Sequence, residues 1–187
     1  MLAEIAISNL GVISHASAEL SPGLTVLTGE TGAGKTMVVT GLRLLTGGRA
    51  DASRVRTGSD GAVVEGAFST GGLPEDAVGA VRDIATAAGA DADENGEYLV
   101  SRSVKASGRS SAHLGGRKVP AATLGELASH LLTIHGQNDQ LRLMAPEQQL
   151  AALDRFDPAI AAKLRRYREA YTDWRAAAKD LKERTEK

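Results

Sequence analysis

The chain has 187 residues, of which 42% are hydrophobic, so it is long and apolar enough for a soluble globular domain with a sizeable core. Its 22 basic and 23 acidic side chains give a formal charge of −1, which lacks the electrostatic footprint of a dedicated nucleic-acid binder. The absence of cysteine excludes disulfides and thiolate metal sites. No apolar run approaches the length of a membrane span and no leader pattern begins the chain, so we expect a cytoplasmic protein without a membrane partner.

The first half of the chain predicts strands and helices in succession. Apolar alternation indicates strands, and apolar residues three and four apart indicate helices. Two consecutive glycines, Gly47 and Gly48, predict the end of the first helix because glycine favours the position after a helix. The expected strands are 2–7, 11–20, 24–27 and 62–68, and the expected helices are 34–46 and 75–88.

The second half begins with a predicted strand at 98–104 and a polar, glycine-rich stretch at 108–116 that favours a hairpin or an ordered loop. Proline is favoured in the first turn of a helix, which predicts a helix over 120–131. A short strand is expected at 132–135, and it leads into a glutamine-containing turn at 136–140.

From residue 160 onwards, apolar and aromatic residues recur alternately four and three positions apart, which is the seam of a coiled coil. The alternative is an amphipathic surface helix that packs on its own domain. Because the pattern continues to the last residues, we expect 156–187 to begin a coiled-coil arm of a longer polypeptide and 1–155 to form the domain before it. The seam residues are Ile160, Leu164, Tyr167, Tyr171, Trp174, Ala178 and Leu181.

A phosphate-binding loop follows the predicted strand at 24–27. It fits the pattern G-x-x-x-x-G-K-[ST] at every fixed position. Its glycines let successive backbone N–H groups point at the oxygens of a bound triphosphate, Lys35 can reach the β- and γ-phosphates, and the Thr36 hydroxyl can hold Mg²⁺. The sequence therefore predicts a site for ATP and Mg²⁺. Its residues are Gly29, Glu30, Thr31, Gly32, Ala33, Gly34, Lys35 and Thr36.

Gln137 is a candidate catalytic residue and a second candidate ligand for Mg²⁺. A glutamine amide after a short strand can offer its oxygen to the metal and its NH₂ group to the γ-phosphate or the attacking water. The alternative is an ordinary polar loop residue, and Gln140 lies nearby. The apolar strand ending in Asp and Glu that a hydrolase of this kind needs is missing, as is a Ser-Gly-Gly signature. We therefore expect the chain to bind ATP but not to hydrolyse it efficiently alone.

These features together resemble the SMC-like ATPases, in which a coiled coil separates the phosphate loop from the remaining catalytic parts. Within that group the chain resembles the RecN family of DNA repair proteins. One departure is Thr40, where family members commonly carry an aspartate. The matching stretches are 7–10, 23–36, 47–51, 108–112 and 134–137.

The resemblance implies an α/β fold: the N-terminal lobe of a phosphate-loop ATPase head of ABC/SMC type, followed by the start of an antiparallel coiled coil. It also implies three partners, namely the C-terminal half of the same head, a second copy joined through an ATP-sandwiched head dimer, and DNA. The implied role is recombinational repair of DNA double-strand breaks. Such heads often place an arginine near the phosphates, for which we choose Arg56, although Arg54, Arg49 or none of them could have that role.

Two other functions remain open. A small phosphate-loop kinase or GTPase would share the loop, but the chain lacks the guanine-reading Asn-Lys-x-Asp and a convincing lid. A coiled-coil interaction protein with a structural, non-hydrolysing nucleotide site would also fit these observations.

Overall fold

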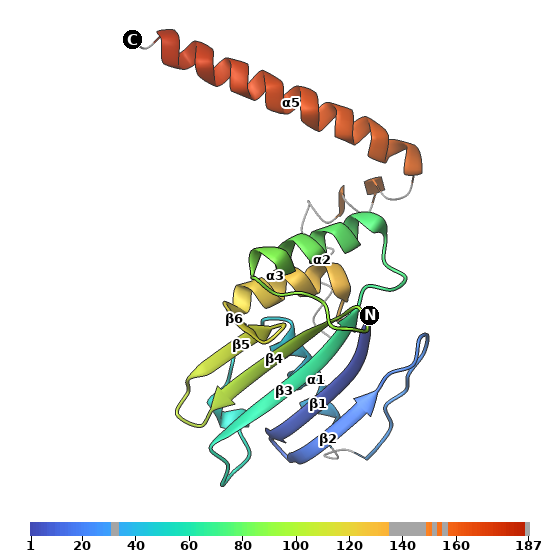
Figure 1. The fold of residues 1–187 in the computed structure, drawn as a ribbon, viewed down its shortest axis with the longest axis vertical. Coiled ribbons are helices and arrows are strands. Elements are labelled where there is room, and N and C mark those ends of the chain that lie inside the picture. The colour runs from blue at the N-terminus through green and yellow to red at the C-terminus, as the bar shows by residue number, and fades with distance from the viewer. Residues whose placement is uncertain (31–33, 135–148, 151–152, 155–156, 186–187) are drawn as a thin grey trace. The chain divides into compact units, whose positions relative to one another are not determined.

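The computed structural model describes residues 1–30, 34–134, 149–150, 153–154 and 157–185 (Figure 1). The chain divides into two compact units, Met1–Thr133 and Ile134–Lys187. The first unit holds the sheet and three helices, and the second holds the long helix α5. Among the described residues, no helix is long and apolar enough to cross a membrane.

The first unit is built on a six-stranded antiparallel sheet with the strand order β2-β1-β3-β4-β5-β6 (Figure 1). The strands expected at 2–7, 11–20, 62–68 and 98–104 are confirmed, and the stretch 108–116 contributes a strand and the turn of a hairpin. The strands are β1 (Leu2–Leu10), β2 (Ile13–Glu19), β3 (Gly61–Ser69), β4 (Glu97–Lys105), β5 (Ser110–Leu114) and β6 (Arg117–Val119).

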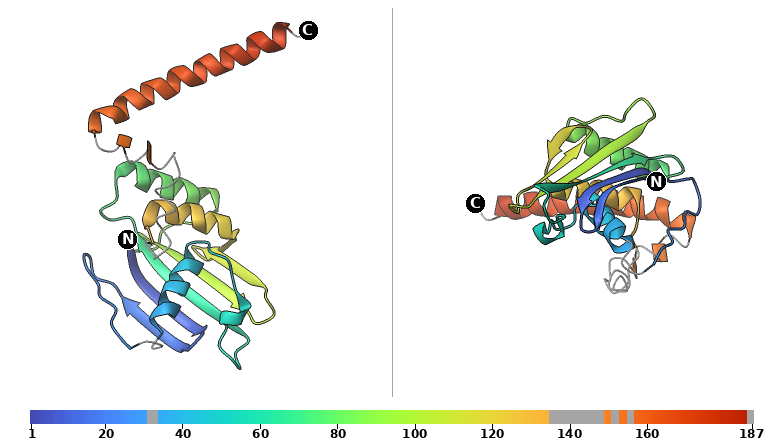
Figure 2. Two further views of the ribbon diagram at one scale, coloured as in Figure 1. Left: turned by 180° about the vertical axis from the view of Figure 1, so that it is seen from behind. Right: turned by 90° about the horizontal axis from the view of Figure 1, so that it is seen from below.

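One face of the sheet carries the hydrophobic core. Helices α1 (Lys35–Leu45) and α3 (Ala121–Leu131) contact the strands, and α2 (Glu75–Ala87) packs on α3. Figure 2 shows α1 in front of the strands when the molecule is turned by 180°. All three helices confirm the predicted ones. The largest fully buried side chains are Ile7, Leu10, Leu45, Val64, Phe68, Val81, Val100, Val104, Leu114, Leu124 and Leu127.

The prediction of a strand at 24–27 is wrong. In the described residues this stretch has no strand partner, and Leu24, Val26 and Leu27 are 89%, 68% and 55% exposed. An apolar segment becomes a strand only where a neighbouring strand accepts and donates its backbone hydrogen bonds. The strand expected at 132–135 is also not formed over 132–134, and its last residue, His135, lies outside the described residues.

The second unit contains α5 (Pro158–Thr185), a helix of 28 residues that confirms the predicted helical periodicity. Just before it, the Asp157 carboxylate accepts a hydrogen bond from the backbone N–H of Ala159 at 2.9 Å, in the manner of an N-cap. The division of the chain at residue 155, between an ATPase lobe and a coiled-coil arm, stays a prediction.

Candidate nucleotide-binding site

The phosphate loop ends where α1 begins, at a glycine that the backbone requires. Gly34 is the N-cap of α1 with φ of 94°, a left-handed conformation that side chains other than glycine rarely adopt. Its carbonyl oxygen accepts hydrogen bonds from the N–H groups of Met37 and Val38, at 2.8 and 3.1 Å. A Cβ atom at this position would also lie 3.3 Å from Cγ1 of Ile13. The loop can therefore reach the helix only with glycine at this position.

Lys35 links the two described ends of the loop. Its ammonium group donates a hydrogen bond to the carbonyl oxygen of Gly29 and another to that of Glu30, the latter at 2.8 Å. The lysine side chain thus turns back towards the start of the loop. Residues 31–33 of the predicted site lie outside the described residues. Of the predicted site residues, the structure therefore brings Gly29 and Glu30 to the ammonium group of Lys35.

A hollow of about 420 Å³ lies against the first turn of α1. One side is formed by the β1–β2 turn and another by the 3₁₀ helix η1 (Ala52–Arg54). Thr36 is exposed at the hollow, where its hydroxyl could hold a metal ion beside a phosphate. The lining residues are Gly11, Val12, Gly34, Lys35, Thr36, Met37, Ser53 and Arg54.

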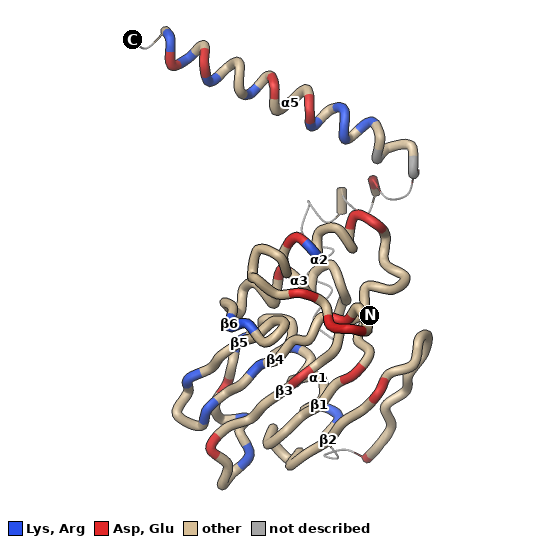
Figure 3. The backbone as a smooth tube through the Cα atoms, viewed as in Figure 1, with Lys and Arg blue, Asp and Glu red and all other residues tan. Residues whose placement is uncertain are grey.

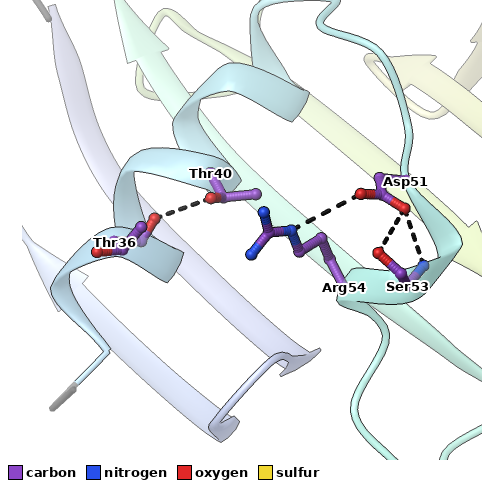
Figure 4. A network of polar contacts seen from close by, with 5 residues as sticks. All are labelled: Thr36, Thr40, Asp51, Ser53 and Arg54. Atoms are coloured by element: carbon purple, nitrogen blue, oxygen red, sulfur yellow. Dashed lines mark hydrogen bonds and ion pairs between the residues drawn. The ribbon is translucent and has the colours of Figure 1, made fainter. Parts of the chain in front are cut away.

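Hydrogen bonds hold η1 in place beside this hollow (Figure 4). The Asp51 carboxylate accepts from the backbone N–H of Ser53 at 3.0 Å and from its hydroxyl at 2.7 Å. These bonds, the hydroxyl first, lower the pKa of Asp51 below its ordinary value. Asp51 also pairs with Arg54 at 3.7 Å, and the Arg54 carbonyl accepts from Gly11 N–H at 2.6 Å. The two sides of the hollow are therefore bonded to each other.

Four of the lining residues, Gly11, Val12, Met37 and Ser53, are not among the residues that the sequence predicts for the site, and Arg54 is predicted only as an alternative to Arg56. Two local features mark the segments that carry most of these residues, namely the β1–β2 turn and the start of η1. Asn9 and Gly11 both have φ of 56°, as turn residues of these types often do. The Asp-x-Ser order at 51–53 is typical of a residue that caps a short helix with its carboxylate. What joins these signals to the phosphate loop is tertiary contact.

Arg56 does not line the hollow. Its Nη1 donates to the carbonyl oxygen of Val12 at 2.8 Å, and its backbone N–H donates to the carbonyl of Asn9 at 2.9 Å. Arg54 is the arginine that lines the hollow, and it is exposed there. A phosphate contact by Arg56 stays a prediction.

Three further observations concern the predicted metal ligands and Thr40. Gln137 lies outside the described residues. The part of the chain that the structure describes contains no cluster of three or more His, Asp or Glu side chains able to hold a metal ion. The Thr40 hydroxyl donates to the Thr36 carbonyl at 2.8 Å, so this residue bonds to its own helix (Figure 4).

Comparison with known sequences identifies close relatives. A family model described as an AAA domain matches residues 4–187. The chain is 55% identical to DNA repair protein RecN of Mycobacterium leprae, over 98% of this chain and 31% of that protein. It is 54% identical to DNA repair protein RecN of Streptomyces coelicolor, over 96% and 30%. The chain thus spans about a third of the length of the curated relatives it matches.

Solved structures with the same fold include SMC heads. The Smc head domain with an extended coiled coil from Pyrococcus furiosus matches 96% of this chain and 47% of that one, with a TM-score of 0.66 at 17% identity. The recombination mediator protein RecF with ATP matches 83% of this chain and 38% of that one, with a TM-score of 0.52 at 18% identity. At these identities the likeness concerns the fold alone.

These comparisons confirm the expected fold class and the resemblance to the RecN proteins. The family match covers almost the whole chain, including the phosphate loop, the hollow beside it and α5. The family implies that the chain binds a nucleotide. The chain belongs to the AAA domain family.

Proposed function

We propose that this chain binds ATP with Mg²⁺ as one lobe of an SMC-like ATPase head, in a protein that repairs DNA double-strand breaks by recombination. One observation carries the nucleotide site: the Lys35 ammonium bonds to the carbonyl oxygens of Gly29 and Glu30, and Lys35 lines a hollow of about 420 Å³. The similarity to RecN proteins supports the DNA repair role. The activity of the whole protein, its DNA substrate and a cytoplasmic location belong to the proposal.

The residues of the loop divide the binding between them. Backbone N–H groups of 29–36 would face the phosphate oxygens, together with the positive end of the α1 dipole. The Lys35 ammonium would exchange its carbonyl partners for the β- and γ-phosphates, and the Thr36 hydroxyl would hold Mg²⁺. The metal ion neutralises phosphate charge when it is bound. Arg54 lies where it could contact the nucleotide from the opposite side of the hollow, and Arg56 would hold the turn that forms its rim.

Hydrolysis would need parts that this chain does not supply. We propose that the C-terminal half of the same head provides the Asp-Glu strand and also pairs with residues 24–27. The exposure of Leu24, Val26 and Leu27 supports this pairing, since a further strand would cover these apolar side chains. A second copy would then close the site through an ATP-sandwiched head dimer. A structure of an SMC ATPase that was solved to explain ATP-driven dimerisation has the same fold, with a TM-score of 0.55 at 18% identity.

Calorimetry with ATP and Mg²⁺ tests the site directly. The chain should bind the nucleotide, and Lys35→Ala should abolish measurable binding because the largest charge contact is lost. The matched control is Lys118→Ala, which removes an exposed lysine of β6 that does not line the hollow. Equal affinities of the Lys35→Ala protein and the original chain would contradict the proposal.

Gln137 needs a different experiment, because its proposed role is in hydrolysis. In a polypeptide of the relatives' full length, Gln137→Ala should reduce ATP turnover far more than ATP affinity. Gln140→Ala is the control for a nearby glutamine. Unchanged turnover in the Gln137→Ala protein would contradict a catalytic role for Gln137. If the unsubstituted full-length polypeptide hydrolyses no ATP, the result would favour an interaction protein with a non-hydrolysing nucleotide site.

A further inference from the structure

Helix α5 presents an exposed aromatic stripe. Tyr167, Tyr171 and Trp174 are 64%, 46% and 62% exposed. The rings of Tyr167 and Tyr171 stack with centroids 5.9 Å apart, and those of Tyr171 and Trp174 lie 5.5 Å apart. The three rings therefore form one continuous ridge along the helix, where a second helix could pack.

The positions beside this ridge carry only positive charge. In a heptad written a to g, Tyr171 falls at a and Trp174 at d, and the flanking positions are e and g. Positions e and g are each either basic or alanine. Every acidic residue of α5 falls at the outer positions c and f (charges in Figure 3). The e residues are Ala161, Arg168, Arg175 and Lys182, the g residues are Lys163, Ala170, Ala177 and Arg184, and the acidic residues are Glu169, Asp173, Asp180 and Glu183.

Two of the flanking charges are available for a partner. Arg168 and Arg175 are exposed, and their side chains make no hydrogen bond or ion pair within the described part of the chain. By contrast, Arg184 already pairs with Asp180 at 2.9 Å within the helix. The positive charges of Arg168 and Arg175, beside the three aromatic rings, therefore have no acidic partner among the described residues.

A second copy of α5 cannot supply the missing charge. In a parallel pair, g of one helix faces e of the next heptad of the other, which sets Lys163 against Arg168 and alanines against the remaining basic residues. In an antiparallel pair, e faces e and g faces g, so basic residues again meet basic residues or alanine. Both arrangements place like charges side by side, and neither contains an attractive pair.

We propose that α5 docks a helix with Glu or Asp at the positions that flank its seam, and not a second copy of itself. Small seam residues on that helix would face the three aromatic rings, because large and small side chains must alternate across a packed seam. This inference rests on the coiled-coil part of the proposed function and is independent of nucleotide binding. The partner is thus specified by charge as well as by the apolar seam.

Two designed peptides test this proposal, each of 28 residues with the same alanine and leucine seam. One carries Glu at every e and g position, and the other carries Lys. Trp174 is the sole tryptophan, so its emission reports packing at the ridge. The acidic peptide should shift the emission to shorter wavelength and bind on the order of tenfold tighter than the basic peptide, with a difference that shrinks in high salt. Equal binding of the two peptides, or binding of neither, would overturn the proposal.

A charge reversal supplies the matched control. The double substitution Arg168→Glu and Arg175→Glu should invert the preference between the two peptides. Arg165→Glu with Arg166→Glu makes the same change of net charge at the outer positions b and c, and it should leave the preference as it was. Dimerisation of the unchanged chain in sedimentation equilibrium, as strong as its binding of the acidic peptide, would also overturn the proposal. Calorimetry with ATP on the same proteins separates this result from a failure of the nucleotide site.

Discussion

The guanidinium of Arg56 donates a hydrogen bond to the carbonyl oxygen of Val12, 2.8 Å away and 44 positions earlier in the chain. Two backbone bonds lie on either side of it, from Arg56 to Asn9 and from Gly11 to Arg54. These three contacts fix the β1–β2 turn against the segment that carries η1. The rim of the hollow is therefore held by bonds between two segments that are distant in the sequence.

Arg56→Ala should destabilise the first unit by about 1 kcal/mol, since one charge-assisted hydrogen bond to a backbone carbonyl is lost. Urea denaturation followed by circular dichroism measures the change. Arg109→Ala is the control, because Arg109 is exposed and its side chain makes no hydrogen bond in the described structure. If the two substitutions have the same effect, the Val12 contact does not stabilise the turn.

Gly47→Ala should destabilise the protein by more than about 2 kcal/mol. Gly47 follows α1 with φ of 79°, and a Cβ atom there would lie 2.5 Å from the Ala121 carbonyl oxygen and 2.7 Å from the Gly125 nitrogen. Both atoms belong to the backbone of α3, so they cannot move aside as the end of a flexible side chain could.

The control for this substitution is Gly58→Ala. Gly58 has φ of 85° but no atom within 4 Å of the position of a Cβ. Gly58→Ala should therefore destabilise the protein only by the cost of the left-handed conformation for alanine, about 1–2 kcal/mol. Thermal denaturation of both proteins separates backbone strain from crowding. A smaller loss of stability for Gly47→Ala than for Gly58→Ala would contradict the close approach of α1 and α3.

Arg102→Met should raise stability by about 1–3 kcal/mol. Arg102 is only 6% exposed on the core side of β4, and its Nε has no hydrogen-bond partner in the described structure. Burial lowers the pKa of its guanidinium, so the folded state opposes the charge. Because arginine titrates far above neutral pH, the gain should be equal at about pH 6 and about pH 8.

Lys105→Met is the matched control on the same strand, where the side chain is exposed. It should leave the midpoint of urea unfolding almost unchanged. A lower midpoint for Arg102→Met than for the original protein would mean that the arginine stabilises the core.

Asp51 should titrate below its ordinary pKa of about 3.9, because the Ser53 hydroxyl and N–H bond to its charged form. Its contribution to stability is complete above that ordinary value and is lost as the pH falls through the lowered pKa. A carbon-13 titration of the carboxyl group measures this pKa. Ser53→Ala should raise the pKa towards the ordinary value, and an unchanged pKa would assign the shift to another group.

Most of the helices and strands could be predicted because the apolar spacing that defines each of them lies within the element itself. The strands β1, β3 and β4 alternate, α1 and α3 have apolar residues at helical spacing, and the glycines of the loop mark its turns. The phosphate loop could be found because its chemistry needs consecutive residues.

Features that depend on distant partners could not be predicted in this way. Residues 24–27 are an apolar, strand-like run, but whether they form a strand depends on a neighbour that the pattern does not specify. The walls of the hollow meet through bonds between residues 9–12 and 54–56, and neither segment alone indicates the other. For the same reason the sequence does not distinguish Arg56 from Arg54 as the arginine nearest the phosphates, and a phosphate contact by Arg56 stays a prediction.

The central claim is that nucleotide binds at the loop 29–36 beside the hollow. Backbone amide NMR spectra of the labelled chain, recorded with and without ATP and Mg²⁺, test it residue by residue. We expect the largest shifts at residues 29–36, smaller ones at residues 11–12 and 53–54 of the rim, and none on the face of the sheet opposite the hydrophobic core. Shifts concentrated away from these segments, or none at saturating nucleotide, would contradict it.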